Sequence, residues 1–197
     1  MLKEVEQKKY CPSCGFKAPF YTMITAGGEV DKCHHCNSDL PDEAEAARGL
    51  ELGRVFVVED TALLREMISD IMVSQGLARE VLACQNGAEF LSRYTQELAR
   101  GARPGLVLLD VVMPILNGIN AAVAMRAVEE GLGQRKVPIL FFTVKPCDEQ
   151  FRKVLSYCSP AMYINKGADA SPERMRVRVA QVVARLFQEM ERGSGDG

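Results

Sequence analysis

The amino-acid sequence predicts an α/β protein with a doubly wound parallel sheet of five strands and a small cysteine-rich module in front of it. Two observations lead to this prediction. From Gly53 onward, short apolar runs alternate with amphipathic stretches, and runs this short and rich in Val, Ile and Leu are typical of strands buried on both faces. Two Cys-x-x-Cys pairs stand near the N-terminus, outside that alternation.

Length and composition fit one main domain with an appendage. The chain has 197 residues, of which 47% are apolar, enough for a proper core. The formal net charge of -2 argues against a mainly electrostatic attraction to nucleic acid or to an anionic membrane. Lys, Glu and Gln dominate the first ten residues, and no signal peptide or long apolar span follows, so we expect a cytoplasmic protein without a membrane segment.

The cysteine-rich module spans residues 8–40. Four of the seven cysteines lie there, as two pairs with eighteen residues between them: Cys11, Cys14, Cys33 and Cys36. This is zinc-ribbon spacing, because two tight turns that aim four thiolates at one point complete a tetrahedral site. The stretch 20–25, followed by Gly27 and Gly28, has the strand and turn character of a hairpin. We therefore predict a zinc ribbon whose folding depends largely on the metal.

Other readings of the module are weaker. A thioredoxin-like redox site uses one such pair within a βαβ unit, and here there are two pairs. His34 and His35 stand inside the second pair, but four cysteines already fill a closed site. Four lysines against three acidic residues give the module a charge of +1, which is no basic stripe for nucleic acid. We expect the remaining cysteines, Cys84, Cys147 and Cys158, to be structural.

Three boundaries divide the chain. Residues 41–52 are rich in Ala and Glu and are predicted to be a linker. Residues 53–192 form the main domain, and residues 193–197 are expected to be a disordered tail.

The first half of the main domain alternates as expected for a parallel sheet. A strand over 54–58 ends in Glu59 and Asp60, and a helix over 61–75 follows. A second strand over 80–83 precedes a helix over 86–100. The third strand, 106–109, is an apolar run that delivers Asp110 to its end before the chain breaks at Pro114 and Gly118.

The second half continues the same pattern. A helix over 119–132 leads to a strand over 137–142 that ends at Thr143, and a helix over 149–155 leads to a short strand over 161–164 before Lys166. Pro172 opens the final helix, 172–190. The apolar stripe of this helix is interpreted as core. The helix is long enough to extend beyond the sheet, so it could also form the contact of a homodimer.

A sheet order of 2-1-3-4-5 brings the carboxyl ends of four strands to one edge. Five polar side chains then converge: Glu59, Asp60, Asp110, Thr143 and Lys166. Clustered carboxylates repel one another unless a cation holds them, so we predict a magnesium site. Asp60 and Asp110 would bind the metal directly with the carbonyl of Val112, and Glu59 through water.

This constellation points to phosphoryl transfer. Asp110 is the expected nucleophile, the metal and Lys166 neutralise the phosphate oxygens, and the Thr143 hydroxyl donates to one of them. The product is an acyl phosphate on Asp110.

On these residues the sequence resembles the receiver domain of two-component response regulators, which has a flavodoxin-like fold. The Glu59-Asp60 pair, Asp110 followed by Met113-Pro114 and Asn117-Gly118, Thr143 and Lys166 all occur in the family's order over roughly residues 53–190. The resemblance implies a histidine kinase or a phosphotransfer protein as phosphodonor. It also implies that Thr143 moves inward on phosphorylation and that Tyr163, the switch aromatic, follows.

Two residues depart from the family pattern. Val144 stands where a small residue is usual, which is expected to narrow access to the phosphate. Gly167 stands where a proline usually follows the lysine, so the rigid Lys-Pro turn is lost. Neither change removes a reacting group.

The sequence therefore predicts a two-component response regulator in which phosphorylation of Asp110 switches binding to an unknown output protein. The alternatives are a transcriptional regulator that contacts nucleic acid through the zinc ribbon, or a phosphate sink for a kinase. Self-phosphorylation and slow autodephosphorylation are expected, and no turnover enzyme.

Overall fold

The computed structural model describes residues 8–25, 28–40, 52–167 and 172–193. The predicted linker, except for Leu52, and residues 194–197 of the predicted tail lie outside these ranges.

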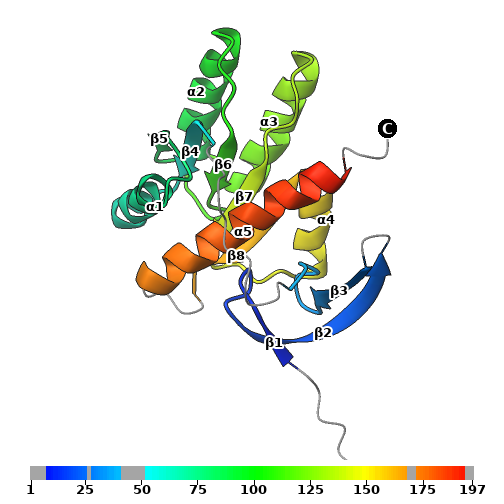
Figure 1. Cartoon of the computed structure of the whole chain (residues 1–197). Coiled ribbons are helices and arrows are strands. Elements are labelled where there is room, and N and C mark those ends of the chain that lie inside the picture. The colour runs from blue at the N-terminus through cyan, green and yellow to red at the C-terminus, as the bar shows by residue number, and fades with distance from the viewer. Residues whose placement is uncertain (1–7, 26–27, 41–51, 168–171, 194–197) are drawn as a thin grey trace, which may run out of the picture.

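The cysteine-rich module is an antiparallel sheet of three strands in the order β1-β2-β3 (Figure 1). β1 spans Lys8–Cys11, β2 spans Phe16–Thr25 and β3 spans Gly28–Cys33. The hairpin register pairs Phe20 with Cys33 and Thr25 with Gly28. The strand character of residues 20–25 is confirmed, and the structure adds four residues to the start of that strand and a third strand before it.

The main sheet has five parallel strands in the order β5-β4-β6-β7-β8, which is the predicted order 2-1-3-4-5. The strand bounds are Arg54–Val58 for β4, Glu80–Cys84 for β5, Leu106–Leu109 for β6, Ile139–Thr143 for β7 and Ala161–Asn165 for β8. β6 and β7 are buried at every position, as strands covered on both faces require. β7 begins two residues later than predicted, just after Pro138, which has no N–H to donate to the ladder.

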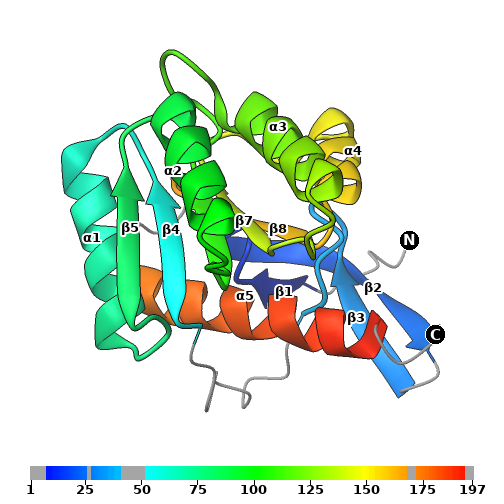
Figure 2. The same cartoon turned by 90° about the horizontal axis from the view of Figure 1, so that it is seen from above.

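Helices cover both faces of this sheet (Figures 1 and 2), and the described residues form five of them. Their bounds are Ala62–Ser74 for α1, Gly87–Ala99 for α2, Gly118–Gly131 for α3, Glu149–Tyr157 for α4 and Pro172–Gly193 for α5. Asn86, Asn117 and Asp148 cap α2, α3 and α4, each accepting a hydrogen bond from a backbone N–H of the first turn. None of the helices in the described ranges combines the length and the apolarity that a membrane crossing requires.

Alternate residues along β4 separate the two layers of the core. Val55 and Val57 face α1 and α5, whereas Phe56 and Val58 face the side covered by α2, α3 and α4. The apolar stripe of α5 is buried from Met175 to Leu186, which confirms its interpretation as core.

A buried ion pair reinforces the second layer. Arg126 of α3 donates to Glu129 at 2.5 Å and to the carbonyls of Val137 and Cys158. Glu129 also accepts hydrogen bonds from the Tyr94 hydroxyl and the Val137 amide. Because each member of the buried pair makes further hydrogen bonds, the pair ties α3 to α2 and to the segments that enter β7 and β8.

The cysteine-rich module packs against β8, α4 and α5 of the main domain (Figures 1 and 2). Arg178 of α5 donates to the carbonyls of Pro12 and Ser13, at 2.8 and 3.3 Å. Arg152 of α4 donates to the carbonyl of His35 at 3.1 Å. The four cysteines thereby join the same apolar cluster as the core on the α4 side of the sheet.

Candidate functional site

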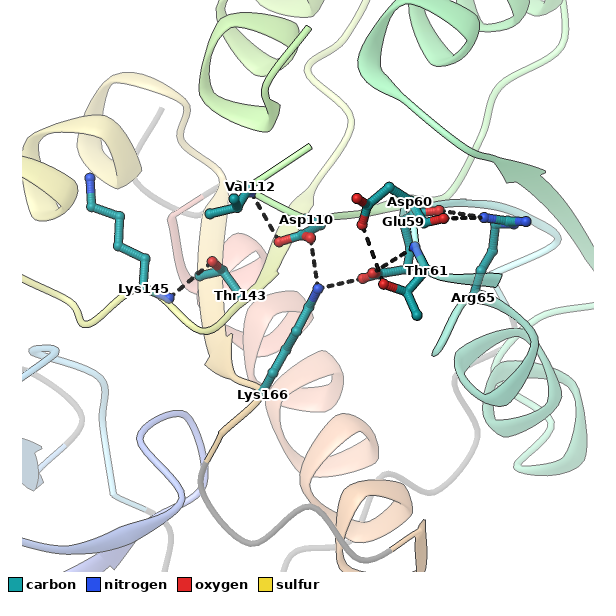
Figure 3. Close-up of polar contacts among 9 residues, drawn as sticks. All are labelled: Glu59, Asp60, Thr61, Arg65, Asp110, Val112, Thr143, Lys145 and Lys166. Carbon is teal, nitrogen blue, oxygen red and sulfur yellow. Dashed lines mark hydrogen bonds and ion pairs between the residues drawn. The ribbon is translucent and has the colours of Figure 1, made fainter. Parts of the chain in front are cut away.

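Three carboxylates meet at the carboxyl edge of the main sheet (Figure 3). Glu59 and Asp60 follow β4, and Asp110 follows β6, so strand order alone brings them together. One oxygen atom of each residue lies within 4.8 Å of the others. Glu59 and Asp110 are 2% and 4% exposed, whereas Asp60 is open to solvent.

Lys166 enters this cluster from the end of β8. Its Nζ lies 2.5 Å from Glu59 Oε2 and 2.7 Å from Asp110 Oδ2 (Figure 3). The backbone N–H of Lys166 donates to the Thr143 carbonyl at 2.9 Å, which continues the β7–β8 ladder by one residue. Two buried carboxylates thus share one ammonium group.

Burial is the main influence on Glu59 and raises the pKa of its carboxyl group. The nearby charge of Asp110 acts in the same direction, while Lys166 and the Thr61 amide act in the opposite one. Burial and the Asp110 charge together outweigh the opposing effects of Lys166 and the Thr61 amide on the pKa of Glu59. A bound cation would relieve this penalty.

The loop after β6 fixes the position of Asp110. The Asp110 N–H donates to the Val58 carbonyl at 2.9 Å, and its Oδ1 accepts from the Val112 N–H at 3.1 Å. A Cβ atom on Gly118 would lie 1.9 Å from the Asp110 carbonyl oxygen. This position therefore requires glycine, because α3 begins in direct contact with the backbone of Asp110.

Thr143 is fully buried at the end of β7, beside Asp110. Its hydroxyl oxygen accepts a hydrogen bond from the Lys145 N–H at 3.1 Å (Figure 3). Tyr163, the predicted switch aromatic, is 3% exposed and lies edge-on to Phe151 of α4. Its hydroxyl contacts the Cys14 sulfur at 3.6 Å, so this side chain lies at the cysteine-rich module and not at the carboxylate cluster.

Arg65 of α1 is a residue that the sequence did not reveal as part of this edge. Its guanidinium donates to the carbonyls of Glu59, at 2.6 Å, and of Asp60, at 3.3 Å (Figure 3). These bonds hold the backbone that carries both carboxylates. Because the partners are main-chain carbonyls, no residue pattern signals the contact.

The four cysteines of the module form a second cluster. Their sulfur atoms lie within 4.8 Å of one another, with 3.6 Å between Cys11 and Cys36 and 3.8 Å between Cys14 and Cys33. A tetrahedron with zinc–sulfur bonds of about 2.3 Å has edges of about 3.8 Å. In each turn, the carbonyl of the first cysteine accepts a hydrogen bond from the N–H of the residue four positions later. That residue is Gly15 in the first turn and Asn37 in the second, and both have the left-handed backbone conformation.

The remaining cysteines are outside both clusters. Burial raises the pKa of Cys84 to about 11 and that of Cys147 to about 12, and it also raises the pKa of Cys158. All three thiols are therefore protonated near neutral pH and poor nucleophiles.

The strand order and the polar carboxyl edge define a doubly wound α/β protein, a class in which ligands generally bind at that edge. Residues 55–179 match the family described as Response regulator receiver domain, so the chain belongs to this family. It is 35% identical over 77 residues to the chemotaxis protein CheY of Bacillus subtilis, a match that covers 39% of this chain and 58% of that protein. It is 31% identical over 136 residues to the DNA-binding response regulator MtrA of Mycolicibacterium paratuberculosis, covering 68% of this chain and 51% of that protein.

The chain thus spans little more than half the length of these two relatives. Solved structures agree on the fold. The match to the CheY4 chemotaxis protein of Vibrio cholerae covers 68% of this chain and 98% of that chain, with a TM-score of 0.53 and 22% identity. A second match is the receiver domain of the histidine kinase CKI1 of Arabidopsis thaliana, complexed with Mg²⁺. This match covers 70% of this chain and 94% of that chain, with a TM-score of 0.55 and 22% identity.

Proposed function

We propose that this chain is a phosphorylation-controlled response regulator, with Asp110 as phosphoacceptor. The observation that supports this most directly is the buried Asp110 carboxylate within 2.7 Å of Lys166 and beside two further acids. Receiver domains interact with histidine kinases and output domains. A histidine kinase or a phosphotransfer protein is therefore the expected donor.

In the transfer step, a carboxylate oxygen of Asp110 attacks the phosphorus atom of the donor's phosphohistidine. The phosphorus–nitrogen bond breaks, the imidazole nitrogen keeps the electron pair, and an acyl phosphate forms on Asp110. Lys166, now shared by Glu59 and Asp110, is placed to pair with a phosphoryl oxygen. The Thr143 hydroxyl, which now accepts a hydrogen bond from the Lys145 N–H, would turn to donate to a second phosphoryl oxygen.

Magnesium fits the carboxylate cluster. Three acidic side chains offer oxygen ligands within 4.8 Å of one another, which is the donor set that a hard divalent cation prefers. Asp60 and Asp110 would hold the ion directly with the Val112 carbonyl, and Glu59 would do so through water. The ion would neutralise the charge of the acids and of the phosphoryl oxygens.

Zinc fits the cysteine cluster. Four buried sulfur atoms at near-tetrahedral spacing, in two matching turns, form a closed site of the structural kind. We propose that Cys11, Cys14, Cys33 and Cys36 hold one zinc ion and that residues 8–40 form a zinc ribbon. The ion would stabilise a module too small to bury a core of its own.

The output is proposed to be a protein interaction. A transcriptional role through the ribbon and a role as phosphate sink are the alternatives. A zinc-loaded chain that binds generic duplex DNA in a salt-dependent way would favour transcription, and rapid loss of the phosphoryl group without change in partner binding would favour a sink.

The test is labelling by radioactive acetyl phosphate with magnesium. We expect label on the wild type and on Asp70→Asn, an exposed acid of α1 that serves as the matched control, and none on Asp110→Asn. An unlabelled wild type, or equal labelling of Asp110→Asn, would rule out the proposal. The half-life of the label separates a switch from a sink.

A further inference from the structure

The backbone of Asn165, the residue just before Lys166, is bound on both sides by groups linked to the first cysteine turn. Its N–H donates to the Ser13 carbonyl at 2.8 Å. Its carbonyl accepts from Arg178 Nη2 at 2.8 Å, and the same guanidinium donates to the carbonyls of Pro12 and Ser13. Ser13 and Arg178 are 0% and 1% exposed, so water does not compete for these bonds.

A second contact joins the same strand to the same turn. Tyr163 and Asn165 are two residues apart on β8, which is the edge strand of the main sheet beside the module. The Tyr163 hydroxyl contacts the sulfur of Cys14, and the backbone N–H of Asn165 donates to a carbonyl in the turn between Cys11 and Cys14. The end of β8 is therefore fixed by a segment whose own shape depends on the cysteine cluster.

Lys166 is the residue directly after Asn165, the last residue of β8 that the ribbon contacts. A lysine side chain is long and flexible, and the residue after it, Gly167, places little restriction on the backbone. The Gly167 N–H donates to Asn165 Oδ1 at 2.8 Å, so the residue after Lys166 is also held by Asn165. The Lys166 backbone is thus held from two sides: its own N–H donates to the Thr143 carbonyl, and the preceding residue, Asn165, is bound by the ribbon.

We infer that the first cysteine turn is a positioning element of the phosphoacceptor site: it holds Asn165, and through it Lys166, so that metal loading at the cysteines raises the receiver's affinity for a phosphoryl group. This inference rests on the proposed function of Asp110 and on zinc at the four cysteines. Coupling between two sites is reciprocal, so a phosphoryl group on the receiver strengthens retention of the metal by the same factor.

Arg178→Met tests this inference, because methionine keeps an unbranched apolar side chain but lacks the guanidinium donors. Arg176→Met is the matched control, on the same helix but exposed. Wild type from which zinc has been removed with a zinc-selective chelator tests the same coupling without a substitution. Two affinities are measured in each full-length protein: that for beryllofluoride at saturating magnesium, and that for magnesium alone.

Holding one flexible side chain in place changes an affinity by about fivefold. We expect Arg178→Met and the zinc-free wild type to bind beryllofluoride about fivefold more weakly than the zinc-loaded wild type, with magnesium affinity within twofold and Arg176→Met unchanged. In the wild type, beryllofluoride with magnesium should raise the affinity for zinc by about the same factor, measured by equilibrium competition with a chelator.

The split between the two affinities separates positioning from general damage, since Lys166 contacts the phosphoryl group and does not bind the metal. Equal beryllofluoride affinity in all four proteins would overturn the inference and leave the proposed function intact. A parallel loss of both affinities would also overturn it, because it would indicate a damaged fold. A wild type that binds no beryllofluoride would refute the proposed function, and the inference with it.

Discussion

Replacing Lys166 by methionine would leave two buried carboxylates without their shared cation. The Lys166 side chain is 10% exposed and lies 2.5 and 2.7 Å from Glu59 and Asp110. Removal of one partner from a buried ion pair costs about 3–5 kcal/mol, and two carboxylates about 5 Å apart repel by about 3 kcal/mol at an effective dielectric constant of 20. We expect Lys166→Met to lose about 3 kcal/mol at pH 7 without magnesium, or about 9 °C in melting temperature.

The loss should shrink as the pH falls. Burial already raises the pKa of Glu59, and removal of Lys166 raises it further. Between the pKa of the unfolded chain and this higher value, the folded variant binds a proton that the unfolded chain does not, so its stability increases toward low pH. Protonation of Glu59 as the pH falls from neutral toward the pKa of the unfolded chain should therefore restore part of the stability.

Urea unfolding followed by circular dichroism at pH 5 and pH 7 measures both effects. Lys145→Met is the control, because Lys145 Nζ lies over the Phe151 ring and pairs with neither acid, and its loss should cost less than about 1 kcal/mol. A loss below about 1 kcal/mol for Lys166→Met at pH 7 would refute the reasoning. A deficit that is equal at the two pH values would refute it as well.

Three further substitutions have expected outcomes. Gly118→Ala sets a Cβ against the Asp110 carbonyl and should cost about 2–3 kcal/mol in urea unfolding and weaken beryllofluoride binding. Glu129→Ala leaves the charge of Arg126 buried without its partner and should cost about 3–5 kcal/mol. Cys33→Ser should abolish stoichiometric zinc, measured by elemental analysis of the purified protein.

Each of these substitutions has a matched control. Gly131→Ala, in a helix with open space around it, should stabilise the protein by about 0.5–1 kcal/mol, and a similar gain for Gly118→Ala would disprove the close contact. Glu130→Ala, next to Glu129 but exposed, should change stability by less than about 0.5 kcal/mol. Cys84→Ser should keep its zinc, and zinc retained by Cys33→Ser would argue against the four-cysteine site.

The sheet and the acids at its edge were predictable because their causes are local. A run such as 106–109 is apolar at every position, which only a strand covered on both faces tolerates, and Asp110 follows it directly. Once the order of the strands was inferred, the proximity of Glu59, Asp60, Asp110 and Lys166 followed from the geometry of parallel strands.

The docking of the two modules was not predictable. Arg178 lies next to the apolar stripe of α5, and a charged residue at such a position is usually solvent-exposed, yet Arg178 is 1% exposed. Its partners are main-chain carbonyls of Pro12, Ser13 and Asn165, and a carbonyl leaves no trace in a residue pattern. The same holds for Arg126, whose burial depends on carbonyls of two distant segments.

The contact between Arg178 and Pro12 joins residues that are 166 positions apart. A ribosome that adds about 5–20 residues per second needs roughly 8–33 s to travel that distance, whereas a hairpin such as β2–β3 closes within about 10 μs. The cysteine turns are therefore synthesised well before α5, the helix that receives them. The hairpin can form early, whereas its docking onto α5 has to wait for one of the last segments of the described chain.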